Sequence, residues 1–507
     1  MKKFMTLLVL AIVASTGTIY AQYASDALRF SQTNYGSSSR FKGLGNAQTS
    51  LGGDISSLGG NPAGLGMFTR SEFALTPEFN NSQANSSYLG NTTTSSKNRL
   101  NLSQIGVAWY NPVVKANGAD LNKGLVSTVF GIGYSRNNDF SSNVTFGGRN
   151  LTSSIGDFFA EQANGATFDN LGRGSIADMA YQNGLIDETI ASPTAYQSAI
   201  GSGNNQYKNE VRSGSTSELN FAGALNFSNQ FYLGASLNIV NVRYLSDAIF
   251  TDNGTIDSDD PANPYDGLNY NVNYRQSQQT DGTGINARLG MIFKPVPAVR
   301  IGASFQTPTW MHISDNSSEY FDVRYPANAP LADVTDFTGN YQFDYSLRTP
   351  YKGSLGASFI IGNHALISAD VDYVDYASIK FSTAANNNNA DARNVVMFNN
   401  MDVKDFYTSA VNYRVGGEYK IADLSLRAGF GVNGSPYKDD NANVFDTKYY
   451  SGGLGYRFSQ YYVDLAYQRV ETNNTYVPYT LSNQSIEPTA DVKLNRNNVF
   501  LTFGVKF

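Results

Sequence analysis

Alternation of apolar and polar side chains is the feature that most limits what this chain can fold into. Every second residue is apolar in Val499–Phe507, and the pattern recurs in Ile285–Lys294, Val299–Phe305 and Leu424–Phe430. A period of two residues predicts strands with one apolar face and one face of different character. A soluble β-sandwich alternates in the same way, so the pattern alone does not distinguish a sandwich from a barrel.

The opposite face of these strands separates the two folds. Charged residues recur there between apolar neighbours, namely Arg288, Arg300, Asp370, Asp372, Arg414, Glu418, Arg427 and Asp464. A water-filled lumen tolerates such charges, whereas the lipid-facing side of a membrane barrel stays free of them. No stretch beyond the first residues approaches 18 consecutive apolar residues, so no transmembrane helix is expected. The pattern therefore favours an all-β, antiparallel transmembrane barrel.

Turn signals divide the chain into 14 expected strands. These are residues 71–80, 99–111, 124–148, 215–228, 230–251, 268–294, 298–325, 339–361, 364–381, 406–420, 423–433, 447–459, 460–472 and 494–507. Tight connections such as Ser228–Gln230 alternate with longer polar loops at 81–98, 149–214, 252–267, 326–338, 382–405, 434–446 and 473–493. Short turns on one side and long loops on the other are typical of outer-membrane barrels.

Composition supports a barrel and excludes several kinds of site. Charged residues make up 15% of the chain, well below the roughly 25% of ordinary globular proteins. The chain has 33 tyrosines and 47 glycines, residues that suit strands and turns. It contains no cysteine, which excludes a disulfide framework and a thiolate metal site. A net charge of −6 gives no support to nucleic-acid binding.

The first 21 residues predict export. Lys2 and Lys3 precede the apolar run Phe4–Ala14, and small or polar residues lead to Ala21, as in a cleaved secretory signal at 1–21. An exported barrel is expected in the outer membrane of a Gram-negative cell, in contact with lipid and lipopolysaccharide. We expect a monomer that the barrel-assembly machinery recognises through its C-terminal strand.

Residues 22–70 are expected to form a plug, or hatch, inside a barrel formed by 71–507. The stretch Phe41–Phe73 contains eight glycines and one proline, with little aliphatic bulk. Such a segment cannot bury enough apolar surface to order itself, so it needs a surrounding wall. Pro62 has a fixed φ and biases Asn61 towards extended geometry, which predicts a tight turn anchored by the Asn61 side chain.

The run Asn61-Pro62-Ala63-Gly64 follows Leu51–Asp54. It resembles the hatch of the FadL-type outer-membrane transporters of hydrophobic compounds, and the chain resembles a Bacteroidetes-like member of that family. The resemblance covers nearly the whole mature chain and also implies 14 strands. It implies passive, hatch-gated transport of hydrophobic molecules such as long-chain fatty acids, with lateral release beside a kinked third strand. The kink candidates in this chain are Gly131, Gly133, Asn137 and Asn138, with Asp139 completing the Asn137-Asn138-Asp139 break.

The long loop 149–214 predicts two short helices at the extracellular mouth, because Ile155, Phe158 and Phe159, and later Ile176, Met179 and Ala180, recur at helical spacing. An apolar face there either packs on its neighbours or, as the resemblance implies, first captures the ligand. The ligand-binding candidates are Ile155, Phe158, Phe159, Met179, Arg288 and Arg414. The two arginines could pair with a carboxylate or with the hatch.

Catalysis and cofactor binding find little support. His312 and His364 fall in different parts of the barrel, and no local Ser-His-Asp arrangement is present. The acidic loop 252–260 lacks the ordered spacing of an EF-hand. We therefore expect no enzyme, no metal site and no cofactor. Two other functions stay open: a FadL-like barrel acting as a partner of type IX-like secretion machinery, and an adhesin or structural barrel.

Overall fold

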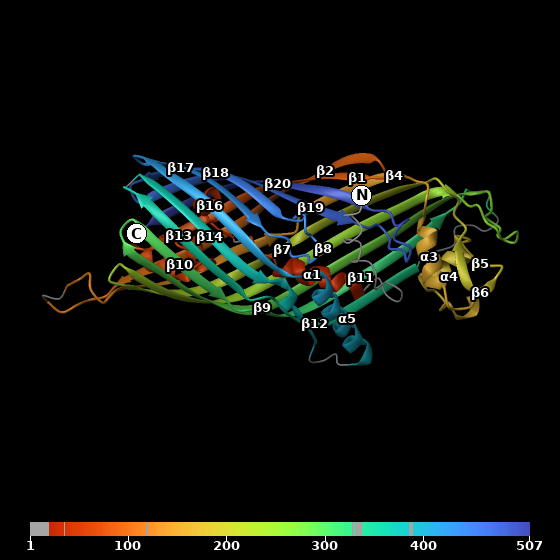
Figure 1. Ribbon diagram of the computed structural model, residues 1–507, viewed down its shortest axis with the longest axis horizontal. Coiled ribbons are helices and arrows are strands. Elements are labelled where there is room, and N and C mark those ends of the chain that lie inside the picture. The colour runs from red at the N-terminus through yellow and green to blue at the C-terminus, as the bar shows by residue number, and fades with distance from the viewer. Residues whose placement is uncertain are drawn as a thin grey trace.

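The computed structural model describes residues 20–34, 36–117, 120–326, 329, 337–362, 364–384 and 389–507. Residues 1–19, nearly all of the expected signal segment, lie outside the described residues, as do parts of the expected loops 326–338 and 382–405. Of the described strands, 18 form one antiparallel sheet that closes on itself, because β1 (Glu72–Tyr88) pairs with both β2 (Asn91–Pro112) and the last strand, β20 (Ala490–Lys506) (Figure 1).

The described part of the chain confirms a barrel of 14 strands, four of which are interrupted. The continuous strands are β1 (Glu72–Tyr88), β2 (Asn91–Pro112), β7 (Asn204–Phe227), β8 (Phe231–Thr255), β9 (Asn269–Val296), β16 (Ser409–Ile421), β17 (Leu424–Asn433), β18 (Thr447–Phe458), β19 (Tyr461–Tyr476) and β20 (Ala490–Lys506). The interrupted strands are β3 (Leu125–Asp139) with β4 (Ser142–Asn150), β10 (Val299–Gln306) with β11 (Trp310–Arg324), β12 (Phe337–Arg348) with β13 (Lys352–Ile361), and β14 (Ala365–Asp375) with β15 (Lys380–Thr383).

The two faces of the wall differ as the alternation predicts. On β9 the side chains of Ile285, Leu289 and Phe293 are exposed on the outside, whereas Asn286 and Arg288 are buried in the lumen. On the N-terminal side of Ile285, the exposed positions of β9 are polar, which marks the outer edge of an apolar belt around the barrel. Among the described residues, no helix is both long and apolar enough to cross a membrane.

Three loop predictions are wrong in part, and one of them is 149–214, whose residues 204–214 belong to β7. Residues 81–98 form the outer half of the β1–β2 hairpin, which turns at Leu89 and Gly90 with positive φ. This stretch is polar on both faces because it extends beyond the apolar belt, and it therefore lacks the alternation that reveals a strand. The described part of the expected loop 382–405 contains a helix, α5 (Ala390–Phe406), and a short turn, η5 (Tyr376–Ser378), precedes it.

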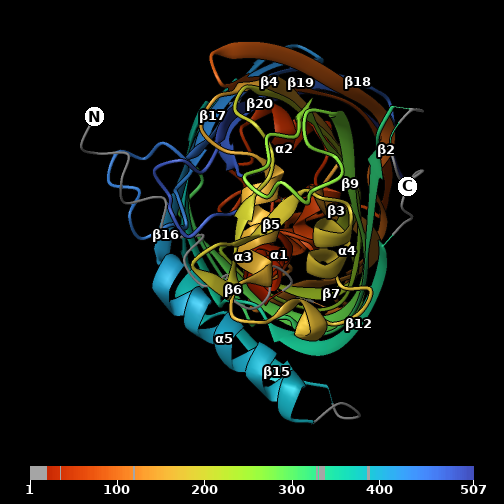
Figure 2. The ribbon, with the colours of Figure 1, turned by 90° about the vertical axis from the view of Figure 1, so that its right-hand side faces the viewer.

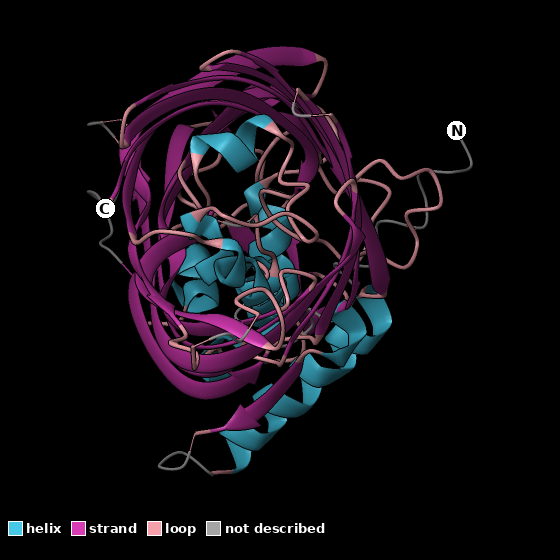
Figure 3. Cartoon of the chain, turned by 90° about the vertical axis from the view of Figure 1, so that its left-hand side faces the viewer, coloured by secondary structure: helices cyan, strands magenta, loops and turns pink. Residues whose placement is uncertain are grey.

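The N-terminal segment lies inside the ring of strands (Figures 2 and 3). It consists of α1 (Tyr20–Ser31), α2 (Ser39–Gly43), η2 (Ile55–Leu58) and η3 (Pro62–Met67). Most of its side chains from Tyr23 to Gly66 are buried. This is the hatch, enclosed by the wall as the fold prediction expects.

The expected mouth helices are present at one end of the barrel (Figure 1). They are α3 (Ile155–Ala163) and α4 (Ile176–Gln182), with η4 (Phe168–Asn170) between them and an unpredicted hairpin of β5 (Ile186–Thr189) and β6 (Ser192–Ser198) after them. Ser154 and Asp157 form a capping box that begins α3.

Burial of the hatch predicts its resistance to trypsin. Lys42 is buried inside the barrel, whereas Lys123 lies exposed in the connection between β2 and β3. In detergent, cleavage after Lys42 should be at least about tenfold slower than cleavage after Lys123, because it requires the hatch to leave the lumen. Mass spectrometry of timed digests measures both rates, and heat-denatured protein is the control. Equal rates in the folded protein would contradict the enclosed position.

Candidate functional site

Asn61 joins the hatch to the wall. Its Oδ1 accepts a hydrogen bond from the Ala63 N–H (3.1 Å) and so begins η3. Its Nδ2 donates to the carbonyl oxygens of Thr49 in the hatch (2.7 Å), Met291 on β9 (3.1 Å) and Ala303 on β10 (3.3 Å). One buried amide therefore caps a helix and bridges two strands, which agrees with the anchored turn expected from the sequence.

The wall approaches this turn closely at two glycines. A Cβ at Gly290 would lie 1.9 Å from Asn61 Oδ1, and one at Gly234 would lie 2.4 Å from the Ala63 nitrogen. Any side chain at either position would push the hatch away. Pro62, Ala63 and Gly64 are buried in the same turn.

A carboxylate holds the next part of the hatch. Asp370 Oδ2 on β14 accepts hydrogen bonds from the backbone N–H groups of Gln48 (2.7 Å) and Thr49 (2.8 Å). Elsewhere, Arg40 Nε in the hatch lies 3.3 Å from Glu418 Oε2, which also accepts a hydrogen bond from Arg427 Nε at 2.7 Å. The hatch is thus attached to the wall by polar contacts on several strands.

The two arginines expected to bind ligand are buried in ion pairs. Arg288 NH2 lies 2.7 Å from Glu218 Oε2, and Arg414 NH1 lies 2.6 Å from Asp372 Oδ2. Lys352 Nζ also lies 3.2 Å from Asp372. Each arginine already has an anionic partner within the wall, so a ligand carboxylate would have to compete with that partner.

The third strand is interrupted where the sequence places its kink. The β2–β3 ladder ends at Gln104↔Ser135, and a register shift in the β3–β7 pairing follows between Arg136 and Asn138. β4 continues the pairing with β7 but forms no ladder with β2 within the described residues. The wall is therefore open, at the level of its backbone hydrogen bonds, between the outer part of β2 and β4.

Side chains bridge this interruption, which we call the β2–β4 break. Asn101 Nδ2 donates to Asp139 Oδ2 (2.6 Å), and Ser95 Oγ donates to the Asn143 carbonyl (2.7 Å). Arg99 NH1 donates to Ser141 Oγ (3.1 Å). Side-chain hydrogen bonds of this kind can separate without breaking a continuous backbone ladder.

The hatch lies directly beside the break. The Asn34 N–H donates to the Asn137 carbonyl (2.7 Å), and the Gly36 N–H donates to Asn137 Oδ1 (3.3 Å). Asn138 Nδ2 lies 3.4 Å from the carbonyl oxygens of Arg29 and Gln32. A shift of this hatch segment would therefore act on the bulged residues of β3.

Gly131 and Gly133 face the hatch. A Cβ at Gly131 would lie 2.8 Å from Leu58 Cδ2, and one at Gly133 would lie 2.7 Å from Leu58 Cδ1. Their structural role is to leave room for the buried Leu58 side chain. They lie below the break, in the part of β3 that still pairs with β2.

Cavities surround the hatch. One of about 50 Å³ lies at the break and is lined by Lys42, Glu78, Arg136 and Arg496 among others. Burial lowers the pKa of the Lys42 ammonium to about 8, and the nearby Glu78 carboxylate opposes this shift. A larger cavity of about 370 Å³ lies beside α1 and is lined by charged and tyrosine side chains.

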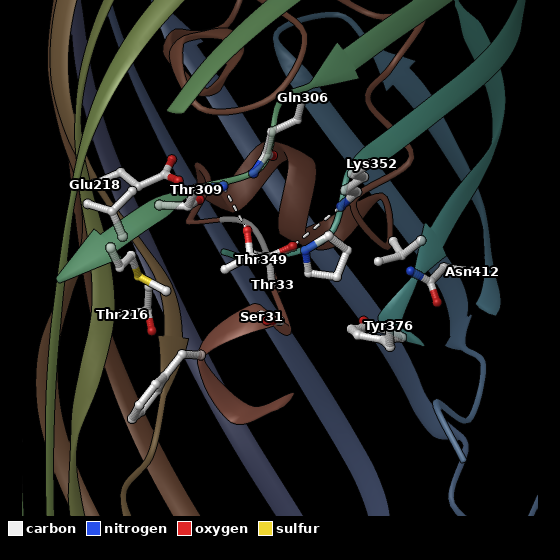
Figure 4. Close-up of a pocket in the computed structure, with 15 residues that line it drawn as sticks. Ser31, Thr33, Thr216, Glu218, Gln306, Thr309, Thr349, Lys352, Tyr376 and Asn412 are labelled. Atoms are coloured by element: carbon white, nitrogen blue, oxygen red, sulfur yellow. Dashed lines mark hydrogen bonds between the residues drawn. The ribbon is translucent and has the colours of Figure 1, made fainter. Parts of the chain in front are cut away.

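Figure 4 shows a third cavity, of about 30 Å³, beside the C-terminal end of α1. Lys352 Nζ lies 3.4 Å from Thr33 Oγ1 there, and the Thr309 N–H donates to Thr349 Oγ1 (2.8 Å). Its volume is on the scale of single water molecules. The hatch thus leaves cavities of different sizes in the lumen, and polar groups line them.

The apolar mouth candidates pack on one another. Ile155, Phe158 and Phe159 on α3 are buried in a single cluster, where Phe159 contacts Phe321 edge-to-face with ring centroids 4.9 Å apart. Met179 on α4 packs against the same cluster. These side chains form the core of the extracellular cap, and the sequence signal that located them was their helical spacing.

Sequence reasoning missed Asn101 and Asp370 as site residues, whereas Asp139 belongs to the predicted kink at Asn137–Asp139. A single Asn or Asp in a polar stretch carries no local pattern, and the importance of these residues follows from partners about 38 to 322 positions away. Of these residues, only Asp370 is among the charged residues that the alternation predicts on the lumen-facing side of the wall.

Comparison with known proteins agrees with this fold. The toluene transporter TodX of P. putida superposes with a TM-score of 0.52 at 12% identity, covering 93% of this chain and 99% of that one. The deltaS2 mutant of the TodX monoaromatic hydrocarbon channel gives a TM-score of 0.54 at 12% identity, with 93% and 99% covered. No curated protein sequence matches the chain.

A family model described as outer membrane protein transport protein (OMPP1/FadL/TodX) matches residues 189–507. Its members and the similar solved structures are transport channels rather than enzymes, which agrees with the expectation from the sequence. The chain therefore belongs to the OMPP1/FadL/TodX family of outer-membrane transport proteins.

Proposed function

We propose that this outer-membrane protein carries long-chain fatty acids or similar amphipathic molecules inward by hatch-gated lateral diffusion. The observation that carries the proposal is the β2–β4 break, where the hatch contacts the bulged residues Asn137 and Asn138 of β3. The similar solved structures are named as transporters of toluene and monoaromatic hydrocarbons, which are hydrophobic.

Lateral release follows from the cost of exposing hydrocarbon to water. Each exposed CH₂ costs roughly 0.8 kcal/mol, so a long acyl chain gains by passing from the lumen into the bilayer. Passage straight into the periplasm would expose the whole chain. The polar residues around the break suit the head group of an amphipathic molecule, which can stay hydrogen-bonded while the chain enters lipid.

The hatch would have to shift before anything passes, because it fills the lumen beside the break. The charged pairs Arg288–Glu218 and Arg414–Asp372 lie within the wall, so a hatch movement leaves them intact. Neither the secretion-partner nor the adhesin alternative is favoured by the family match. Contact with lipopolysaccharide, recognition by the assembly machinery and the monomeric state stay predictions.

Locking the break should stop uptake. The variant N101C/D139C places two cysteines where the native side chains meet at 2.6 Å, in a chain with no other cysteine. Oxidation should lower uptake of labelled palmitate at least about tenfold, and a reductant should restore it, since the route opens at this site.

The matched control is N81C/N98C, whose native side chains also meet at 2.6 Å but within the continuous β1–β2 ladder. Its oxidation should leave uptake unchanged. Full cross-linking of N101C/D139C with normal uptake would reject the lateral route.

Loosening the hatch should make the barrel leak. Asn61→Leu removes the amide that donates to the Thr49, Met291 and Ala303 carbonyls, and unsatisfied buried acceptors cost about 1–3 kcal/mol each. We expect a higher ion conductance in planar bilayers while heat-modifiable migration stays normal.

Asn61→Asp keeps the acceptor for the Ala63 N–H but loses the donor, so it should leak as well. Asn98→Leu, on the exposed outer hairpin, is the control and should conduct like the native protein. Wild-type conductance in both Asn61 variants would show that the amide does not hold the hatch closed.

A further inference from the structure

Between β15 and β16, the part of the chain that the structure describes forms the helix α5 rather than a strand. β14 pairs with β16 only up to Asp375↔Ser409, and β15 then pairs with β12 from Tyr345↔Thr383 to Arg348↔Lys380. No strand among the described residues pairs with the other edge of β15. An unpaired edge of a sheet leaves backbone donors and acceptors that need partners.

Helix α5 supplies those partners. The Phe381 N–H on β15 donates to Asn400 Oδ1 (2.9 Å), and Asn400 Nδ2 donates to the Phe381 carbonyl (3.1 Å). The Asn400 amide thus substitutes for the peptide group of a neighbouring strand. Figures 2 and 3 show α5 against the outside of the ring, with its axis across the barrel axis.

The inner face of α5 reaches the hatch. Val395 and Val403 are buried in the same apolar cluster as Tyr23 and Ala27 of α1. Tyr407, directly after α5, donates its hydroxyl to the Ala24 carbonyl (3.1 Å). A continuous apolar layer therefore runs from the hatch to this helix, at a place where the wall has no continuous ladder.

The outer face of α5 carries an exposed apolar stripe. Met397, Phe398 and Met401 are 49%, 37% and 52% exposed. The apolar belt begins just below the helix, with the half-exposed side chains of Val411 and Tyr413 on β16. A helix that lies in the membrane plane, with an apolar stripe continuous with this belt, fits the boundary between head groups and acyl chains.

We propose that α5 lies in the outer-leaflet lipid through Met397, Phe398 and Met401 and closes a second lateral opening between β15 and β16. Through this opening an apolar ligand passes from the outer leaflet to the apolar layer around α1. The inference rests on the proposed transport function and adds the side from which the ligand arrives, whereas the β2–β4 break is where it leaves.

Fluorescence tests the lipid contact. The variant M401C, labelled with an environment-sensitive NBD group in vesicles, should be quenched by lipids that carry a doxyl group near the head group. L151C, whose native side chain is exposed at the far extracellular end of β4, should give a water-like, unquenched signal. Identical signals from the two labels would overturn the placement of α5 in lipid.

Photolabelling tests the opening. Palmitate carrying a terminal diazirine is added to vesicles that contain the full chain, with and without excess palmitate. Saturable labelling of Val395, Val403 or the part of α1 from Tyr23 to Ala27 supports the opening. Saturable labelling confined to β3, β4 and hatch residues 29–34 beside them overturns it but keeps the proposed function. Absence of saturable labelling anywhere overturns both.

Discussion

The rest of the structure depends on hydrogen bonds between the hatch and the barrel wall. Many peptide groups of the hatch bond within the hatch itself, but its helices and turns are short, so other buried groups need partners on the wall. Asn61 donates outward from the hatch to carbonyls of β9 and β10, and Asp370 accepts inward from two hatch N–H groups. These contacts require close backbone approach, which explains the glycines that face the hatch on β8 and β9.

The arrangement of buried charge in the lumen is compatible with the proposed movement of the hatch. Removing one partner of a buried pair leaves an uncompensated charge, which costs several kcal/mol. The pairs of Arg288 and Arg414 lie within the wall and do not involve the hatch. Among the charges of the hatch, Arg40 lies beside Glu418, which keeps Arg427 as a second partner.

Interruptions of the ladder are the places where we propose that this barrel opens. A closed sheet satisfies its backbone groups through its neighbours, so each interruption needs a substitute. Asn101 provides a side-chain bridge at the β2–β4 break, and Asn400 takes the place of a strand at β15. The gap between β10 and β11 contains Pro308, and the gap between β12 and β13 contains Pro350. The two gaps lie side by side and are joined by a hydrogen bond from the Thr349 N–H to the Thr309 carbonyl (3.0 Å).

Sequence alone determined what local periodicity can encode: 14 strands from alternation and turns, two mouth helices from helical spacing, and a plug from its glycines. It did not reveal α5, whose inner face meets the hatch while its outer face carries Met397 and Met401, so that apolar residues occur on both sides and blur the helical period. Only the tertiary structure decided that Gly131 and Gly133 make room for Leu58, and that Asn101 and Asp370 find partners far along the chain. The physical reason is that hydrogen bonds and close contacts depend on distance in space, which a one-dimensional pattern records only for near neighbours.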